Sequence, residues 1–256
     1  MALVSVLHLV AATHTGLVRL RNEDSYGFAG LSDAVANGEV ISRTVRKEGC
    51  LVVVADGLGG HPYGHVASRI AVRSLLDSAP GSSSELIQGV HAANRHVVEG
   101  MFEDSRLMGM GTTIAAVLFL QEGISVVNVG DSSVFEFAAG RLEKLSTDDI
   151  PNDSGGSLGM PTAIVTQTLG GGRTLTAVTP HLFEDRLTGR RQFLVCSDGL
   201  TNFVHREEIV TILRGASGVD AVHALIDRTL EAGAPDNVTI VIAEVEDETI
   251  EQVVKA

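Results

Sequence analysis

The chain has 256 residues, of which 44% are hydrophobic and 20% charged, and its 19 basic and 32 acidic side chains give a formal net charge of −13. This length and composition are typical of one globular domain with a sizeable core, so we expect a single domain over residues 1–256, with 246–256 as a C-terminal tail. The negative surplus repels a phosphate backbone and no apolar stretch reaches the ~18 residues of a membrane span, so neither nucleic acid nor membrane is expected as a partner.

The apolar start of the chain, residues 1–12, lacks the basic residues that open a signal peptide, so we interpret it as the first strand. Cys50 and Cys196 are the two cysteines, and each lies beside an apolar run that predicts a strand. Buried reduced thiols fit this placement, and a disulfide is the alternative. The sequence therefore predicts a cytoplasmic protein.

Further short runs rich in β-branched residues predict strands at 25–29, 51–55, 112–119, 124–129, 134–138, 192–196 and 238–245. Apolar residues at helical spacing predict three helices, over 67–75, 86–101 and 222–230. The turns at 121–123 and 139–140 are too short for a crossover helix, which indicates antiparallel pairing. The polar stretches 30–49 and 148–162 predict surface loops. Strands between two groups of helices favour an α+β layered sandwich.

An acidic residue recurs at the ends of the predicted strands. Asp56, Asp131 and Asp198 each follow an apolar run and adjoin a glycine, whereas Asp236 stands where a strand begins. A single Asp-Gly pair is usually a turn, but three pairs at strand ends form a pattern. Carboxylates that meet repel one another unless a cation neutralises them, and oxygen ligands suit Mg²⁺ or Mn²⁺. The sequence thus predicts a divalent metal cluster.

A second charged segment holds Arg19, Glu23 and Asp24 just before the strand predicted at 25–29. The planar guanidinium of an arginine can hold two phosphate oxygens, and nearby carboxylates can orient water on metal ions. The alternative is a surface turn with solvated charges.

Six short motifs resemble, in the same order, those of the metal-dependent type 2C protein phosphatases, and the bacterial short form is the most similar. They are Arg19-x-x-Asn22-Glu23-Asp24, Ala55-Asp56-Gly57-Leu58-Gly59-Gly60-His61, Gly111-Thr112-Thr113, Gly130-Asp131-Ser132, Ser197-Asp198-Gly199-Leu200 and Asp236-Asn237-x-Thr239. Each motif alone is weak, but six in order across residues 19–239 are specific.

The resemblance implies a four-layer α-β-β-α sandwich, with two central antiparallel sheets flanked by helix pairs and two Mn²⁺ or Mg²⁺ ions at one edge. It implies that Asp56 bridges the two ions and that the carbonyl of Gly57 completes one metal site. Asp198 and Asp236 would complete the other metal site.

The resemblance also assigns roles around these ions. Glu23 and Asp24 would act mainly through metal-bound water, and Asp131 together with Asp198 would hold a weaker third ion. Arg19 would bind the substrate phosphate. The catalytic residues implied are therefore Arg19, Asp56 and Asp198.

The implied activity is hydrolysis of phosphoserine and phosphothreonine by in-line attack of a water that two metal ions activate, without a phosphoenzyme. The implied partners are phosphorylated proteins, including a cognate kinase, and the chain is expected to be a monomer. The segment Gln167-Thr-Leu-Gly-Gly and a short flap resemble phosphatases paired with kinases in bacterial type VI secretion, and this link is a hypothesis.

The chain departs from the family pattern at several positions. Leu58 stands where many members carry a histidine that could donate a proton, and we interpret His61 as stabilising a turn rather than as catalytic. Ser133 stands where an arginine is common. The flap after Asp149 is shortened, so substrate choice and affinity for the third ion are open.

Two other functions remain as alternatives. A non-catalytic phosphoprotein-binding or scaffolding module on the same fold predicts lost metal ligands, whereas Asp56, Asp198 and Asp236 are all present. A magnesium-dependent nucleotide hydrolase or kinase predicts a Gly-x-x-x-x-Gly-Lys-Ser/Thr loop, which the sequence lacks.

Overall fold

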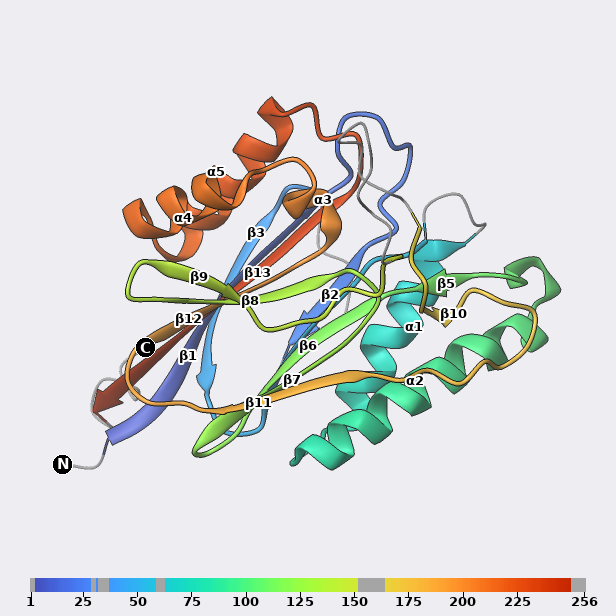
Figure 1. Ribbon diagram of the computed structural model, residues 1–256, viewed down its shortest axis with the longest axis horizontal. Helices are drawn as coiled ribbons and strands as arrows, with labels where there is room; N and C mark the ends of the chain where they lie inside the picture. Colours follow the sequence, from blue (N-terminus) through green and yellow to red (C-terminus); the bar gives the residue numbers. More distant parts are fainter. Residues whose placement is uncertain (1–2, 29–30, 32–36, 59–62, 152–163, 250–256) are drawn as a thin grey trace.

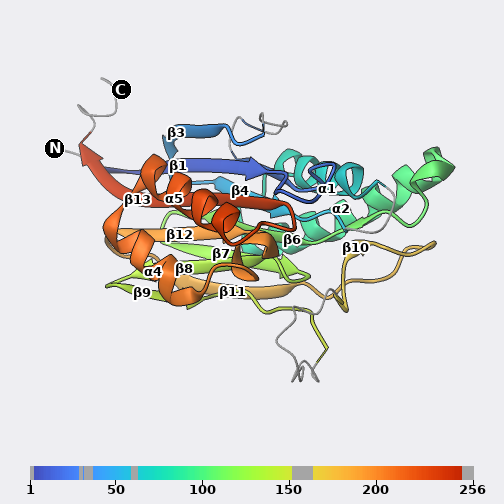
Figure 2. The ribbon, with the colours of Figure 1, turned by 90° about the horizontal axis from the view of Figure 1, so that it is seen from above.

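Two antiparallel sheets lie face to face at the centre of the computed structural model (Figure 1, Figure 2). The structure describes residues 3–28, 31, 37–58, 63–151 and 164–249. The larger sheet has six strands in the order β3-β1-β13-β12-β8-β9. These strands are β1 (Leu3–His14), β3 (Val40–Arg46), β8 (Ser133–Ala138), β9 (Arg141–Lys144), β12 (Arg191–Cys196) and β13 (Val238–Thr249).

The second sheet has five strands in the order β11-β7-β6-β4-β2, and a short pair, β5 with β10, lies apart from it. The strands of this sheet and of the pair are β2 (Ser25–Phe28), β4 (Cys50–Ala55), β5 (Gly111–Thr112), β6 (Ile114–Phe119), β7 (Gly123–Val129), β10 (Leu169–Gly170) and β11 (His181–Arg186).

Helices cover the outer face of each sheet (Figure 2). α1 (Gly64–Asp77) and α2 (Ser83–Glu103) pack on the five-stranded sheet, and a short 3-10 helix, η1 (Ser105–Leu107), follows α2. α3 (Asp198–Thr201), α4 (Arg206–Gly215) and α5 (Gly218–Glu231) lie on the side of the six-stranded sheet. The predicted α-β-β-α sandwich is therefore confirmed.

The number of covered faces explains the sequence of each strand. β4 and β6 are covered on both faces, so every residue of the two strands is buried and each is an unbroken apolar run. In β12 the side chains alternate: Phe193 and Val195 point toward the other sheet, whereas Leu194 and Cys196 point toward the helices.

The side chains between the two sheets form one apolar cluster, which we call the inter-sheet layer. Phe119 and Phe193 meet edge to face in this layer, with ring centroids 5.3 Å apart. The layer includes Leu7, Leu9, Ala11, Val52, Val54, Ala115, Val117, Phe119, Val126, Phe193, Val195, Val241 and Ala243.

Several smaller expectations are confirmed. Cys50 and Cys196 are buried and not joined in a disulfide. The turn at 139–140 joins β8 to β9, and both Ala139 and Gly140 have positive φ, as a tight hairpin turn between twisted strands requires. As a separate observation, none of the helices in the described part of the chain has the length and apolar content of a membrane span.

Other expectations were wrong. The loop predicted over 30–49 contains β3, a largely exposed edge strand whose sequence has no strong apolar alternation. The tail predicted from residue 246 begins too early, since β13 continues to Thr249 and pairs with β1 along twelve residues; 250–256 lie outside the described residues. The prediction missed α3, α4 and the short or exposed strands β9, β10 and β11, where few apolar positions repeat.

We expect Phe193→Ala to lower the free energy of unfolding by about 3–5 kcal/mol, because Phe193 is fully buried and its removal leaves a cavity between the sheets. A urea titration followed by circular dichroism measures this loss. Phe183→Ala, at a partly exposed position on the edge strand β11, is the control and should cost about 1 kcal/mol or less. Equal losses in the two variants would contradict the central place of the inter-sheet layer.

Candidate functional site

The acidic residues that the sequence singles out lie at one edge of the sandwich. The last residue of β4 pairs with the first of β2, which sets Asp56 beside Asp24. In the six-stranded sheet β12 ends next to the start of β13, which sets Asp198 beside Asp236. Asp131 follows the end of β7 and precedes β8. Strand ends from both sheets thus gather all five residues.

Asp24 ties the two sheets together. Its Oδ2 accepts hydrogen bonds from the hydroxyl groups of Ser197, at 2.8 Å, and Thr239, at 2.7 Å, both in the six-stranded half. The chain of bonds continues outward, since Thr13 lies 2.7 Å from the Thr239 hydroxyl and accepts from Asn22. The other oxygen, Asp24 Oδ1, is buried without a hydrogen-bond partner.

Asp56 lies at the centre of the group. The charges of Asp24, Asp198, Asp131 and Asp236 all act on its carboxyl. The strand predicted over 112–119 is interrupted at Thr113, between β5 and β6. This segment holds the backbone of Asp56: Asp56 N donates to Thr113 Oγ1 at 3.0 Å, and Asp56 O accepts from Thr112 Oγ1 at 2.8 Å. The backbone that carries the Asp56 carboxyl is therefore held by the segment just before β6.

Burial raises the pKa of each of these carboxyl groups, and the charge of neighbouring carboxylates raises it further. The pKa of Asp24 rises to about 6, that of Asp198 to about 6 and that of Asp131 to about 7. The pKa of Asp56 lies well above its ordinary value, since Asp24, Asp198 and Asp131 all add to the effect of burial. Without a cation, the group holds protons near neutral pH.

Arg19 and Asp236 form an ion pair at the rim of the group. Arg19 Nη2 lies 2.7 Å from Asp236 Oδ2, and this hydrogen bond raises the pKa of the guanidinium. Asp236 Oδ1 accepts from the backbone N–H of Asn237 at 2.9 Å. Glu23 is half-buried, and burial raises its pKa. Each predicted charged residue thus lies at this edge.

Asn237 organises the loop that carries Arg19 and Glu23. Its Oδ1 accepts from the backbone N–H of Glu23 at 2.9 Å, and its Nδ2 donates to the carbonyls of Thr15, at 2.8 Å, and Arg21, at 3.0 Å. Sequence reasoning named Asn237 only as a letter of a motif, because a loop anchor has no spacing signal of its own.

Two further anchors were missed. Asn202 donates to Asp198 Oδ2 at 2.8 Å, and its place four residues after Asp198 is a signal that could have suggested it. Asp149 accepts from the backbone N–H of Gly130, from Gln167 and from His181, at 2.8, 3.0 and 2.9 Å. Asp149 thereby holds two later segments against the turn that precedes Asp131.

Glycine is required at two positions where backbones touch. A Cβ on Gly57 would lie 2.4 Å from the Gly64 carbonyl oxygen, and a Cβ on Gly199 would lie 1.8 Å from the Asn237 carbonyl oxygen. The absence of a side chain at Gly57 and Gly199 therefore lets two segments of protein backbone meet.

The donor set fits a hard divalent cation. All side-chain donors are oxygens, they are mostly buried, and Asp24 Oδ1 lacks a hydrogen-bond partner. Within the described ranges, no three His, Cys, Asp or Glu side chains stand in a coordinating arrangement. The assignment of individual ligands, including the Gly57 carbonyl, stays a prediction.

The positions that depart from the family pattern are partly described. Leu58 N donates to the Gly111 carbonyl at 3.0 Å, so this residue is held by backbone pairing. Ser133 is buried and its hydroxyl donates to the Asp131 carbonyl at 3.4 Å. His61 lies outside the described residues, and so does 152–163 of the predicted short flap.

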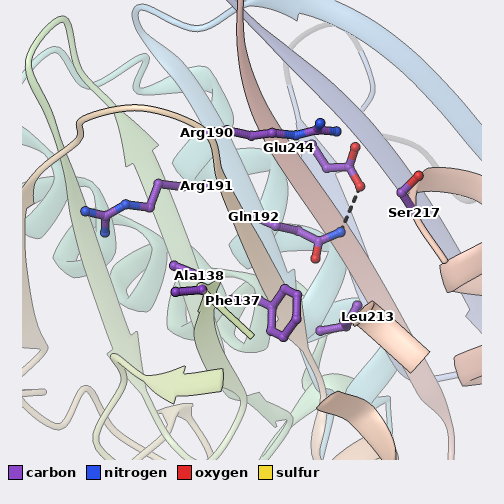
Figure 3. Close-up of a pocket in the computed structure, with 9 residues that line it drawn as sticks. Phe137, Ala138, Arg190, Arg191, Gln192, Leu213, Ser217 and Glu244 are labelled. Atoms are coloured by element: carbon purple, nitrogen blue, oxygen red, sulfur yellow. Dashed lines mark hydrogen bonds between the residues drawn. The ribbon is translucent and has the colours of Figure 1, made fainter. Parts of the chain in front are cut away.

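A pocket of about 240 Å³ opens elsewhere, on the outer face of the six-stranded sheet (Figure 3). Its floor holds Gln192, whose amide donates to Glu244 at 2.8 Å, and Phe137 and Leu213 form apolar walls. We call Asp24, Asp56, Asp131, Asp198 and Asp236 the carboxyl group cluster. Gln192 lies in β12, six residues before Asp198, so this pocket is roughly 20 Å from the carboxyl group cluster. It belongs to a different part of the molecule.

Comparisons with known proteins agree with this geometry. Residues 31–236 match the protein phosphatase 2C family. The chain is 32% identical, over 263 residues, to the serine/threonine protein phosphatase PstP of Mycobacterium tuberculosis, an alignment that covers 94% of this chain and 46% of PstP. The chain thus spans about half the length of that curated relative.

Two solved structures are similar along nearly the whole chain. The catalytic domain of PstP, in complex with two manganese ions, is 31% identical with a TM-score of 0.76, covering 94% of this chain and 99% of that one. PppA, described as a key regulatory component of the type VI secretion system in Pseudomonas aeruginosa, is 26% identical with a TM-score of 0.75, covering 96% and 100%. The chain belongs to the protein phosphatase 2C family, and the resemblance of its six motifs is confirmed.

We expect the metal-free protein to become less stable as pH rises from 5 to 7.5. The folded state holds protons on Asp24, Asp198 and Asp131 with pKa values of about 6 to 7, whereas the unfolded chain releases them near pH 4. The folded state therefore binds more protons in this window, and stability falls with pH. Urea midpoints measured in EDTA at pH 5, 6 and 7.5 test this.

Asp131→Asn should flatten the pH dependence of the metal-free protein, because it removes the carboxyl whose pKa is about 7. Added Mn²⁺ should remove most of the loss at pH 7.5 by offsetting the carboxylate charges. Stability that rises with pH in EDTA would contradict this electrostatic account.

Proposed function

We propose that this chain is a metal-dependent protein phosphatase that hydrolyses phosphoserine and phosphothreonine. The observation that carries the proposal is the convergence of carboxyl groups from both sheets at one edge of the sandwich, with Asp24 buried and the others partly buried. The similarity to a PstP catalytic domain that holds two manganese ions supports it. A bacterial Ser/Thr phosphatase is the function that best uses such a site.

The proposed cofactors are two Mn²⁺ or Mg²⁺ ions. Asp56 would contact both of them, the Gly57 carbonyl would serve one, and Asp198 and Asp236 the other. When bound, the ions would supply an activated water and the positive charge that stabilises the phosphoryl oxygens. The raised pKa of Asp56 and Asp198 supports this, because a site that is costly to ionise alone is stabilised by cations.

Asp131, with Asp198, is proposed to hold a weaker third ion. Glu23 and Asp24 are proposed to orient water around the ions. The two carboxyl oxygens of Asp24 differ in their partners: Oδ2 accepts hydrogen bonds from Ser197 and Thr239, whereas Oδ1 is buried without a hydrogen-bond partner. Asp24 would thus hold the two sheets together through Oδ2 and accept a proton or a hydrogen bond from water at Oδ1.

Arg19 is proposed to bind the substrate phosphate. A guanidinium has five N–H donors, and among the described residues that of Arg19 makes a hydrogen bond with Asp236 alone. Its side chain is 39% exposed, so donors remain for a phosphate that arrives from solvent. The ion pair also keeps the guanidinium aimed at the carboxyl group cluster.

The attack is proposed to be in line and direct, with no covalent phosphoenzyme. Cys196 is fully buried, and burial raises the pKa of its thiol to about 12, so it stays protonated and apolar. A thiolate nucleophile is therefore not supplied at this edge.

The proposed partners are phosphorylated proteins, including a cognate Ser/Thr kinase, and the chain is proposed to act as a cytoplasmic monomer. The likeness to PppA supports a role beside a type VI secretion system, but the sequence identity to the PstP catalytic domain, 31%, is higher than the 26% to PppA. A gene neighbourhood that holds both a kinase and secretion components is the observation that would favour the secretion role.

The alternative, a non-catalytic phosphoprotein-binding module, makes a different prediction. It requires phosphopeptide binding without hydrolysis in Mn²⁺ or Mg²⁺. The presence of Asp56, Asp198 and Asp236 at one edge favours the enzyme.

We expect the wild-type protein to hydrolyse p-nitrophenyl phosphate with Mn²⁺ and to lose this activity in a chelator. Asp198→Asn should reduce kcat/KM by at least about 100-fold, because it removes a central charge from the site. Asp131→Asn should reduce it by about tenfold, since the third ion is the weaker one. Steady-state kinetics over a range of Mn²⁺ concentrations measure both effects.

Asp220→Asn, on the exposed first turn of α5, is the control and should keep full activity. Full activity in Asp198→Asn would refute the proposed site. Phosphopeptide binding without any hydrolysis by the wild-type protein would instead support the scaffolding alternative.

A further inference from the structure

A second arginine lies beside the carboxyl group cluster with an unusual partner. Arg21, in the loop before β2, is exposed, and its Nη1 lies 2.9 Å from His65 Nε2 in the first turn of α1. Because a guanidinium only donates, this imidazole nitrogen must accept, and His65 is therefore neutral in this contact. Arg21 keeps its full charge.

Arg69 adds a second charge to the same place. It lies four residues after His65, one turn along α1, so the two side chains share a helix face. Burial lowers the pKa of His65, and the charges of Arg21 and Arg69 lower it further. We call Arg21, His65 and Arg69 the α1 basic patch.

Some arginines of the described residues are neutralised by a carboxylate, and the two arginines of the patch are not among them. Arg19, Arg191 and Arg228, for example, each pair with a carboxylate. In the part of the chain that the structure describes, neither Arg21 nor Arg69 forms an ion pair with a carboxylate, although the protein carries a net charge of −13. Both face solvent.

The patch borders the proposed site directly. His65 Nδ1 is 3.9 Å from Glu23 Oε1, and the charge of Arg21 acts on Glu23. Apart from Arg19, the charged residues predicted at this edge are carboxyl groups, which repel an acidic peptide. The patch is thus the cationic flank on which an acidic substrate could lie while its phosphate reaches Arg19.

We propose that the α1 basic patch binds an anionic group of the substrate that lies near the scissile phosphoserine or phosphothreonine, either an acidic side chain or a second phosphate. This inference rests on the proposed phosphatase function. It makes the patch a determinant of substrate specificity, separate from the groups that act on the scissile phosphate.

The test uses phosphothreonine peptides of one length whose flanking positions are all Glu, all Gln or all Lys, and a fourth with a neighbouring phosphoserine. Phosphate release gives kcat/KM for each peptide, divided by the value of the same variant on p-nitrophenyl phosphate. Fluorescence anisotropy with labelled peptides measures binding in parallel, whether or not hydrolysis occurs. The variants are Arg21→Glu, Arg69→Glu and the double variant.

We expect the wild-type protein to prefer the Glu peptide over the Lys peptide by roughly tenfold, since each exposed ion pair changes an equilibrium by up to about fivefold. The double variant should prefer the Lys peptide instead. The wild-type preference should shrink in 0.5 M NaCl, where exposed charges are screened. The Gln and phosphoserine peptides separate a carboxylate ligand from a phosphate ligand.

Arg73→Glu is the matched control, because Arg73 is exposed on the next turn of α1, farther from Glu23. It should keep the wild-type preference in both binding and hydrolysis. Equal treatment of the Glu and Lys peptides by the wild-type protein, or an unchanged preference in the double variant, overturns the inference. If the wild-type protein did not hydrolyse p-nitrophenyl phosphate, only the proposed function would be overturned. The anisotropy measurement would still show whether the α1 basic patch binds acidic peptides.

Discussion

Carboxyl groups can be packed together inside a protein only if protons or cations offset their charge, and this constraint governs the edge of the sandwich. Asp24, Asp56, Asp131 and Asp198 are largely removed from water, and each has a raised pKa. Arg19 neutralises Asp236 at the rim, but the described contacts give the other four no such partner. Repulsion between ionised carboxyl groups therefore destabilises this edge, and bound cations would reduce that repulsion.

The strand pattern made the edge predictable. Asp56 and Asp198 end unbroken apolar runs, and such runs signal strands with both faces covered, as β4 and β12 have. Antiparallel pairing then brings strand starts beside strand ends, so Asp24 meets Asp56 without any long-range information. The layers and the site location were accessible from sequence for this reason.

The supporting contacts were not accessible in the same way. Asn237 and Asp149 form hydrogen bonds with backbone groups of loops that are distant in sequence. The residues next to Asn237 and Asp149 in sequence form no pattern that would indicate which loops these are. β3 and β11 were missed because edge strands are half-exposed and need no apolar alternation. A one-dimensional pattern reports burial well and loop anchoring poorly.

The inter-sheet layer has a consequence for ion selection. Asp56 follows a strand of the five-stranded sheet and Asp198 a strand of the six-stranded one, so the distance between these two proposed ligands depends on the thickness of the inter-sheet layer behind them. Val54 and Val195 occupy that layer just behind the two carboxyl groups. Mg²⁺ demands near-ideal octahedral geometry at about 2.1 Å. A larger or smaller side chain in place of either valine would change the distance between the two carboxyl groups, and with it the preference for one metal over another.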